Sequence, residues 1–154
     1  MSVEALIEKL SPLVEHLAGV DLSAPDKVAA ELNSELPLAS PQISEIGQLF
    51  AQGIKEGWLC DREAGGARFS RVAKPSEQTH NFSIDAVSMS GPGVWHRHTK
   101  GEIDLCFASS GNAKFDGQPE GWVVFGEGSE HVPTVTDGEM HILYFLPDGA
   151  VEWK

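Results

Sequence analysis

Cysteine is scarce in this chain, and long apolar runs are missing. The two cysteines, Cys60 and Cys106, form no C-x-x-C pair. Two cysteines cannot build the disulfide framework of a small secreted domain, so we expect reduced thiols and a cytoplasmic protein. The first residues contain no basic segment followed by an apolar one, which predicts the absence of a secretory signal. No apolar run reaches the ~18 residues that a membrane span requires.

Basic side chains are also few. Lysine and arginine together number 11, against 23 aspartates and glutamates, and the formal net charge is −12. Proteins bind nucleic acids and anionic membrane surfaces through clustered cationic side chains. We therefore expect neither of them as a partner. The acidic charge favours solubility and does not identify a substrate.

The chain has two parts of different character. Its 154 residues, 41% of them hydrophobic, suffice for one domain with its own core. Residues 1–57 have the apolar spacing of amphipathic helices, and residues 58–154 have short runs typical of β-strands. No repeat or long linker separates the two parts. We predict one compact domain in which the helical segment packs on the β-structure.

The helices can be placed approximately. The apolar stripe of the first helix recurs at three- and four-residue intervals and consists of Leu6, Ile7, Leu10, Leu13, Val14 and Leu17. Ser23, with Asp26 three residues later, predicts a capped start for a second helix. Ser40 and Pro41 predict the start of a third helix, and Gly57 predicts its end.

The second part predicts a mostly-β fold. Its candidate strands are rich in β-branched and aromatic residues and cover 68–73, 81–89, 101–108, 113–115, 121–125, 132–136 and 140–146. Ser110-Gly111-Asn112 and Asp137-Gly138 are among the predicted turns between them. Short strands at intervals of ~8–12 residues, without alternating helices, are typical of an antiparallel sandwich or barrel.

The most informative stretch contains His96, His98 and Glu102. Side chains alternate along a strand, so two histidines one residue apart share a face and can reach the same cation. Glu102 can fold back as a third ligand, and His131, at the start of a later run, can supply a fourth. Neutral imidazoles with a carboxylate and no thiolate suit a divalent transition metal such as Zn, Fe(II) or Mn.

These residues resemble the cupin superfamily. His96, His98 and Glu102 match its first motif, H-x-H-x3-E, and Gly128-Ser-Glu-His131 matches the ligand-bearing part of its second motif. Gly126 and Val135 stand where proline and asparagine are common. The resemblance implies a single antiparallel cupin-type β-barrel of the jelly-roll kind, a metal held by these four side chains, and a homodimer. Some cupin-like barrels carry no metal, so a metal-free polar pocket is the alternative.

Strand alternation adds two residues to the predicted interior. If Glu102 points inward, Asp104 and Cys106 also point inward. A buried carboxyl group beside another acid has a perturbed pKa, which suits proton transfer. We therefore predict Glu102 and Asp104 as catalytic residues, with orientation of a ligand histidine as the alternative role of Asp104. Cys106 has no evident basic partner and is predicted to line the barrel.

Three further residues are candidates for binding a substrate. Trp95 and Trp122 can line a pocket for a planar ligand, although a core position is the ordinary alternative for each. Arg71 can pair with a substrate carboxylate, and Arg68 then lies on the opposite face of the same strand. A surface position is the ordinary alternative for Arg71.

A narrower resemblance covers nearly the whole chain. The blocks from Trp95 to Phe107, from Gly121 to Phe125, from Gly128 to Val135 and from Leu143 to Trp153 look like those of 4-hydroxylaminobenzoate lyases. That family converts 4-hydroxylaminobenzoate and water to 3,4-dihydroxybenzoate and ammonia in nitroaromatic degradation. The resemblance implies a lyase that acts on a small aromatic carboxylate.

Two other functions are compatible with the same fold. A cupin oxygenase acting on a small aromatic acid or thiol would consume oxygen and depend on Fe(II). A ligand-binding cupin without catalysis is the second alternative. The N-terminal helices are acidic, which disfavours a DNA-linked regulator among such proteins.

Overall fold

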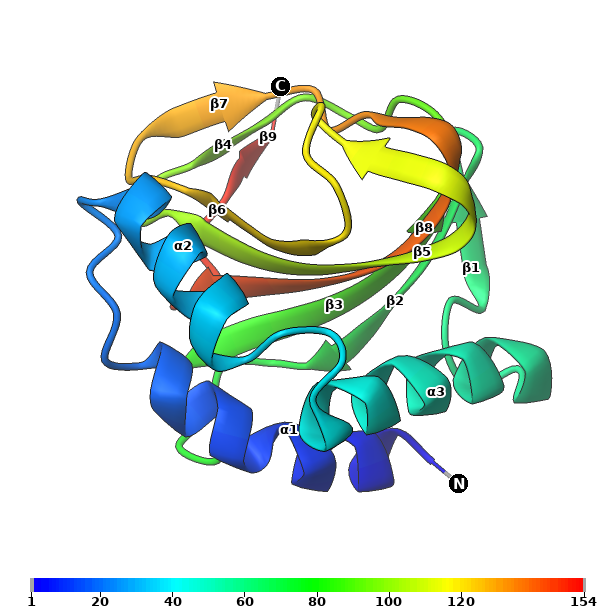
Figure 1. The fold of residues 1–154 in the computed structure, drawn as a ribbon, viewed down its shortest axis with the longest axis horizontal. Helices are drawn as coiled ribbons and strands as arrows, with labels where there is room; N and C mark the ends of the chain where they lie inside the picture. The colour runs from blue at the N-terminus through cyan, green and yellow to red at the C-terminus, as the bar shows by residue number, and fades with distance from the viewer. Residues whose placement is uncertain (1, 154) are drawn as a thin grey trace.

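The computed structural model describes residues 2–153, which form three layers. Figure 1 shows the helices on one side of a large sheet and a smaller sheet on the other side. The helices are α1 (Val3–Leu17), α2 (Pro25–Glu35) and α3 (Pro41–Glu56). The strands are β1 (Arg62–Ala64), β2 (Ala67–Ala73), β3 (Phe82–Met89), β4 (His96–His98), β5 (Glu102–Phe115), β6 (Gly121–Phe125), β7 (Ser129–His131), β8 (Val135–Pro147) and β9 (Glu152–Trp153).

Both sheets are antiparallel. The large sheet has the order β1-β2-β3-β8-β5-β6, and the small sheet has the order β7-β4-β9. The two sheets face each other as in a jelly roll, and non-consecutive strands are neighbours within each of them. This arrangement confirms the predicted mostly-β, cupin-type fold with an N-terminal helical segment packed on it.

The two faces of the large sheet have different neighbours. The outer face packs against the helices, and Ile84, Ile103 and Phe145 there are fully buried with Leu6 and Phe50 in one apolar core. Burying side chains of this size stabilises the fold by about 1.5–3 kcal/mol each. The inner face turns toward the small sheet. The helices therefore anchor the large sheet and leave its inner face available for chemistry.

The helix boundaries follow their capping residues. The Ser40 side chain accepts a hydrogen bond from the Ile43 amide, and Gly57 ends α3 with φ of 87°, both as predicted. The predicted Ser23 cap of α2 is wrong, because Ala24 occupies the N-cap without a side-chain hydrogen bond. The Ser23 hydroxyl instead donates to Asp21 within the preceding turn.

The predicted turns at Ser110-Gly111-Asn112 and Asp137-Gly138 are also wrong. Both segments lie inside long strands, β5 and β8, whose register shifts between Ala108 and Lys114. Gly111 pairs with Gly138 there, and a Cβ on Gly138 would lie 2.0 Å from the carbonyl oxygen of Ser110. The glycines therefore permit a bulged close approach of two strands rather than a reversal of the chain.

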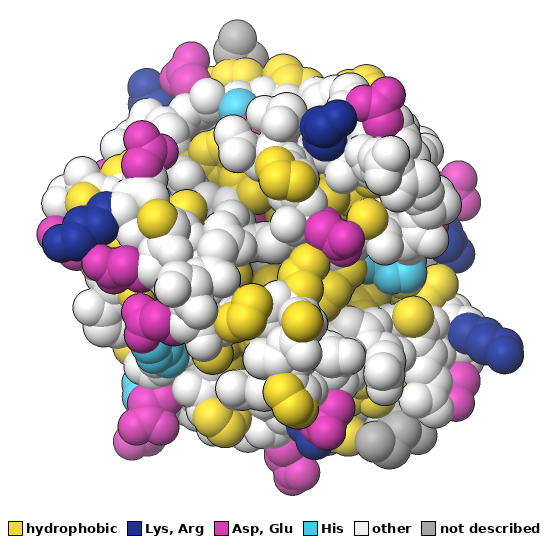
Figure 2. All heavy atoms as spheres, in the orientation of Figure 1, with side chains coloured by type: hydrophobic (Ala, Val, Ile, Leu, Met, Phe, Trp, Pro, Cys, Tyr) yellow, Lys and Arg dark blue, Asp and Glu magenta, His cyan; other side chains and the backbone are white. Residues whose placement is uncertain are grey.

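Charged residues are dispersed over the face of the molecule shown in Figure 2. Figure 2 shows acidic side chains spread over one face, with Lys and Arg not gathered into a patch. Among residues 2–153, no helix combines the length and the apolar character needed to cross a membrane.

Candidate metal centre

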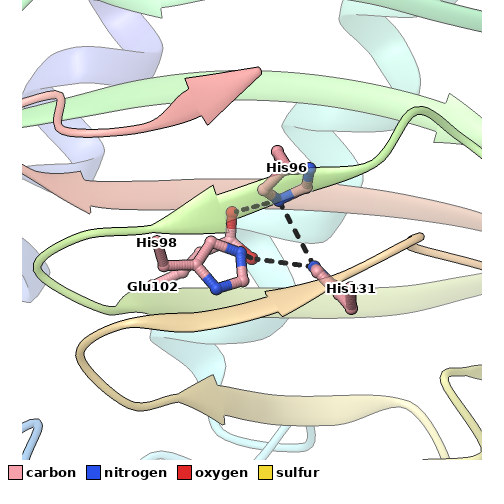
Figure 3. A group of neighbouring side chains, drawn as sticks. All are labelled: His96, His98, Glu102 and His131. Carbon is pink, nitrogen blue, oxygen red and sulfur yellow. Dashed lines mark hydrogen bonds and ion pairs between the residues drawn. The ribbon is translucent and has the colours of Figure 1, made fainter. Parts of the chain in front are cut away.

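Four side chains converge between the two sheets. His96 and His98 come from β4, His131 from β7 and Glu102 from the start of β5. Figure 3 shows them pointing toward one another, and one ligand atom from each lies within 4.8 Å of the other three. Register pairing of His96 with His131 in the small sheet brings together residues that are 35 positions apart.

The shorter distances between these atoms match the spacing of ligands around one ion. Nε2 of His96 lies 3.5 Å from Oε1 of Glu102, and Nε2 of His98 lies 3.1 Å from Oε2. Nε2 of His131 lies 3.3 Å from Nε2 of His96 and 4.0 Å from Oε2 of Glu102. Ligands at about 2.1 Å from a common ion are separated by roughly 3–3.5 Å.

The hydrogen-bond acceptor at Nδ1 of each imidazole, on the side away from the cluster, fixes the tautomer of that ring. The Ser129 hydroxyl donates to the Gly126 carbonyl at 2.6 Å, so it accepts from Nδ1 of His98 at 2.9 Å. The Val94 carbonyl accepts from Nδ1 of His96 at 3.1 Å. The Asp116 carboxylate accepts from Nδ1 of His131 at 2.5 Å. In each neutral ring, Nε2 therefore carries the lone pair that faces the cluster.

This donor set fits a metal ion. Among residues 2–153, Nε2 of His98 and Oε2 of Glu102 are buried without a hydrogen-bond partner, because with His98 protonated at Nδ1 neither atom carries a proton to share. The lone pairs of His96 and His131 also face each other. A cation between these atoms would pair all of them, which is the usual reason for such an arrangement in a buried site.

The charges in the cluster suit metal binding. Burial alone would raise the pKa of Glu102, but hydrogen bonds from His96 and His98 and the positive charge of His98, when these rings carry a proton toward the carboxylate, outweigh it and hold that pKa well below its usual range. Burial lowers the pKa of His131 despite the opposing effect of Asp116. At neutral pH the cluster therefore presents a carboxylate and a neutral His131 imidazole, the forms that bind a cation.

Asp104 lies on the same inner face, as strand alternation predicts. It is fully buried, and neither of its carboxyl oxygens has a hydrogen-bond partner among residues 2–153. Burial, together with the neighbouring charge of Glu102, raises the pKa of Asp104 well above its ordinary value. A buried carboxyl group whose pKa is raised in this way holds its proton to higher pH than an exposed aspartate and can act as an acid.

A row of polar residues continues from Asp104 across the inner face. In the strand register, Asp104 of β5 lies opposite Tyr144 of β8, Tyr144 lies opposite Asp85 of β3, and Asp85 lies opposite Arg71 of β2. Residues paired in this way share one side of a sheet. Arg71 is half exposed, and its Nε lies 2.6 Å from Oδ1 of Asp85. The structure therefore places Arg71 on the same face as the cluster, in an ion pair.

The two tryptophans predicted to bind substrate have different positions. Trp95 lies directly before β4, partly buried and next to His96 in the chain. Trp122 lies on the outer face, where its indole nitrogen donates to the Leu36 carbonyl at 2.9 Å and its ring is 6.4 Å from that of Phe145. The structure does not bring Trp122 to the cluster, because its register partner Leu105 faces the helices.

Cys106 and His141 lie on opposite faces of the large sheet, and neither belongs to the cluster. Cys106 is fully buried within the inner apolar cluster, and burial raises the pKa of its thiol. His141, on the outer face, stacks on Phe50 with ring centroids 5.0 Å apart. Sequence reasoning missed Asp116, which orients His131. An Asp-Gly pair predicts a turn, and no local signal indicates that this aspartate reaches a histidine fifteen residues later.

Comparison with solved structures gives partial likenesses. An oxalate oxidase in complex with the substrate analogue glycolate has a TM-score of 0.43 and 14% identity, over 59% of this chain and 56% of its own. A salicylate 1,2-dioxygenase from Pseudoaminobacter salicylatoxidans has a TM-score of 0.42 and 10% identity, over 70% of this chain and 34% of its own.

Sequence comparison is more specific. A 4-hydroxylaminobenzoate lyase from Nocardioides sp. (strain LMS-CY) is 30% identical over 162 residues, which cover 98% of this chain and 92% of the relative. A second 4-hydroxylaminobenzoate lyase, from Pseudomonas putida, is 28% identical over 95% of this chain and 94% of its own length. The family model described as PnbB: 4-hydroxylaminobenzoate lyase matches residues 9–153, a span that includes every residue of the cluster, and the chain belongs to that family.

Proposed function

We propose that this protein is a lyase that converts 4-hydroxylaminobenzoate and water to 3,4-dihydroxybenzoate and ammonia. The family match over residues 9–153 carries the proposal, because it includes both the cluster and Asp104. The reaction removes the hydroxylamine oxygen, places a hydroxyl group on the neighbouring ring carbon and replaces the nitrogen substituent by a second hydroxyl group. Two waters enter and one leaves, so one water is consumed for each ammonia released.

The cluster residues would hold a divalent metal. When bound by His96, His98, Glu102 and His131, an ion such as Zn, Fe(II) or Mn supplies a Lewis acid for an oxygen of the substrate. The burial of Glu102 and His98 keeps bulk water from these ligand atoms, which strengthens electrostatic interactions at the centre.

Asp104 is the acid–base residue in this proposal. Its neutral carboxyl group donates a proton to the hydroxylamine oxygen, which leaves as water with the electrons of the N–O bond. The resulting carboxylate accepts a proton from the water that adds to the electron-poor ring. Addition of a second water to the C=N carbon, and loss of ammonia with the proton of the newly hydroxylated ring carbon, then restore the aromatic ring. The protons balance, because Asp104 gives one and regains one.

Arg71 is the residue we propose for the substrate carboxylate. It stands three strand positions from Asp104 on the inner face, about 14 Å away along the sheet at the usual spacing. Its long side chain extends from that position, and a benzoate can span the remaining space. Asp85 already holds the guanidinium, which leaves its other nitrogens able to bind a carboxylate. Trp95, next to His96, is proposed to line the ring site.

We also propose a cellular location, an oligomeric state and partners for the protein. Cys60 and Cys106 are buried free thiols, which is compatible with a cytoplasmic location. We propose a homodimer, which sedimentation of the purified protein would test. The partners are a small aromatic carboxylate and a second copy of the chain, without nucleic acid or membrane.

One assay decides the function. Purified protein is incubated with 4-hydroxylaminobenzoate, with and without added divalent metals, and ammonia and 3,4-dihydroxybenzoate are measured together. We expect equimolar products from the wild type and a loss of activity in Glu102→Gln and Asp104→Asn. Oxygen uptake is recorded in the same vessel, because an oxygenase would consume it. Absence of both products under every metal condition would exclude the lyase.

A further inference from the structure

The C-terminal strand β9 places an exposed tryptophan beside the metal centre. Trp153 pairs in register with His96, and Glu152 pairs with Arg97. Because paired residues share a face of the sheet, Trp153 lies on the side that His96 and His131 occupy. The rings of Trp153 and His96 are 5.3 Å apart at their centroids, and 62% of Trp153 is exposed.

Ion pairs hold β9 in this register. Arg97 projects from the opposite face of β4, where its guanidinium lies 3.5 Å from Glu152 and 3.6 Å from Glu130 of β7. Glu130, Arg97 and Glu152 are thus neighbours on the face of the small sheet that points away from the large sheet. His131, His96 and Trp153 are neighbours on the face that points toward it. The position of the indole is therefore defined by strand pairing, although β9 has two residues.

Three exposed apolar residues are close in sequence or in strand register to the cluster ligands. Among residues 2–153, the large hydrophobic side chains that are exposed are Phe69, Val94, Val132 and Trp153. Val94 lies two residues before His96, and Val132 follows His131. An exposed valine needs no explanation, but an exposed indole 5.3 Å from the ring of a buried cluster histidine is suited to receive an apolar ligand.

The sheet orders put Trp153 at the edge of the small sheet away from β7. Strands β6 and β7 form adjoining edges of the two sheets, because only residues 126–128 connect them. At the other edge of the small sheet, residues 148–151 connect β9 to β8, which lies inside the large sheet two strands from β2. β9 and β2 both lie on the side of their sheets away from the β6–β7 connection, and His96 is 4% exposed where its register partner Trp153 is 62% exposed.

We propose that Trp153 is a substrate-binding residue whose indole stacks on the aromatic ring of the substrate at the entrance to the metal centre. This inference rests on the proposed function for the identity of the substrate. An indole offers a large flat surface that loses little freedom on binding and favours aromatic over saturated rings. With Arg71 on the carboxylate, stacking would direct the hydroxylamine nitrogen toward Asp104 and the cluster.

A pair of ligands tests the stacking itself. 4-Aminobenzoate and trans-4-aminocyclohexanecarboxylate have the same polar groups on an aromatic and a saturated ring. We expect the wild type to bind the aromatic acid more tightly and Trp153→Ala to bind it about 5-fold less tightly, with little change for the saturated acid. Trp153→Phe should retain most of the preference. Trp58→Phe is the matched control, because Trp58 packs on the helical side of the large sheet.

Turnover and metal content separate this inference from the proposed function. With 4-hydroxylaminobenzoate, Trp153→Ala should raise KM by a similar factor, change kcat less and keep the metal stoichiometry of the wild type. If the wild type forms no product but its preference for the aromatic acid disappears in Trp153→Ala, the proposed function fails and the stacking role stands. If Trp153→Ala keeps the wild-type KM and the aromatic preference, the inference is wrong. It is also wrong if the wild type shows no preference between the two acids.

Discussion

Asp116 accepts a hydrogen bond from Nδ1 of His131 at 2.5 Å, on the side of the imidazole that faces away from Glu102. The other carboxylate oxygen of Asp116 accepts from the Thr134 amide at 2.9 Å, and the Asp116 amide donates to the Thr134 carbonyl. Three hydrogen bonds thus tie Asp116, in the β5–β6 turn, to His131 and to Thr134 just before β8. His131 is thereby held with Nε2 toward the cluster, as an outer carboxylate does in many metal sites.

Substitution of Asp116 by asparagine should weaken metal binding without removing a ligand. The amide keeps a similar shape but loses the charge that favours the Nδ1-protonated tautomer of His131. We expect a loss of roughly 10–100-fold in metal affinity, measured by competition with a chromophoric chelator. Asp137→Asn is the matched control, because Asp137 has a similar positive φ of 62° but pairs with Lys114 on the surface. Equal affinities in both variants would contradict this role.

Removal of the metal should lower the stability of the fold as well as its activity. A ligand that binds only the folded state at a hundred times its Kd stabilises it by about 2.7 kcal/mol. We expect chelation to lower the Tm of the wild type, and expect His96→Ala to contain no stoichiometric metal and to have a Tm insensitive to chelator. A wild type without metal in any preparation, and with a Tm that added metals do not change, would support the metal-free polar pocket.

Asp104→Asn should abolish most of the turnover and leave metal content unchanged. Asparagine preserves the shape of the side chain but can neither donate the carboxyl proton nor accept it back, and general acid–base catalysis contributes typically about 10²–10⁴-fold. Because burial raises the pKa of Asp104, the required acid form is present below that raised pKa. The wild-type rate should therefore fall as pH rises through it, and the residual rate of Asp104→Asn should lack this decrease. The same alkaline decrease in the variant would assign it to another group.

Arg71→Ala should raise the KM for the substrate by about tenfold or more, because a charge-assisted pair with a carboxylate contributes roughly 1.5–3 kcal/mol. The effect should be smaller for a substrate analogue without the carboxylate. Arg68→Ala is the control on the opposite face of the same strand, with Ser88 as its register partner. An equal KM in the two variants would place the carboxylate site elsewhere.

Local sequence patterns were enough to predict the metal ligands, but they did not predict every residue that surrounds those ligands. Alternation along a strand is a strict geometric rule, so the sequence alone could assign His96 and His98 to one face of a strand, and Glu102 and Asp104 to one face of the next. Asp116 and the position of Trp153 depend on contacts between distant segments, which no local spacing reveals. The glycines at Gly111 and Gly138 were misread for the same reason, since a turn and a bulge require the same backbone freedom.

Trp122→Phe should reduce stability and leave substrate binding intact. The indole of Trp122 is buried on the helical side of the large sheet, and its nitrogen bonds the Leu36 carbonyl that follows α2. Phenylalanine removes that bond and part of the packing against Phe145, at a cost of about 1–3 kcal/mol. Urea unfolding should therefore show a lower midpoint, while KM stays within twofold of the wild type at a temperature where both proteins are folded. A raised KM with unchanged stability would return Trp122 to the substrate site, in conflict with its position on the outer face.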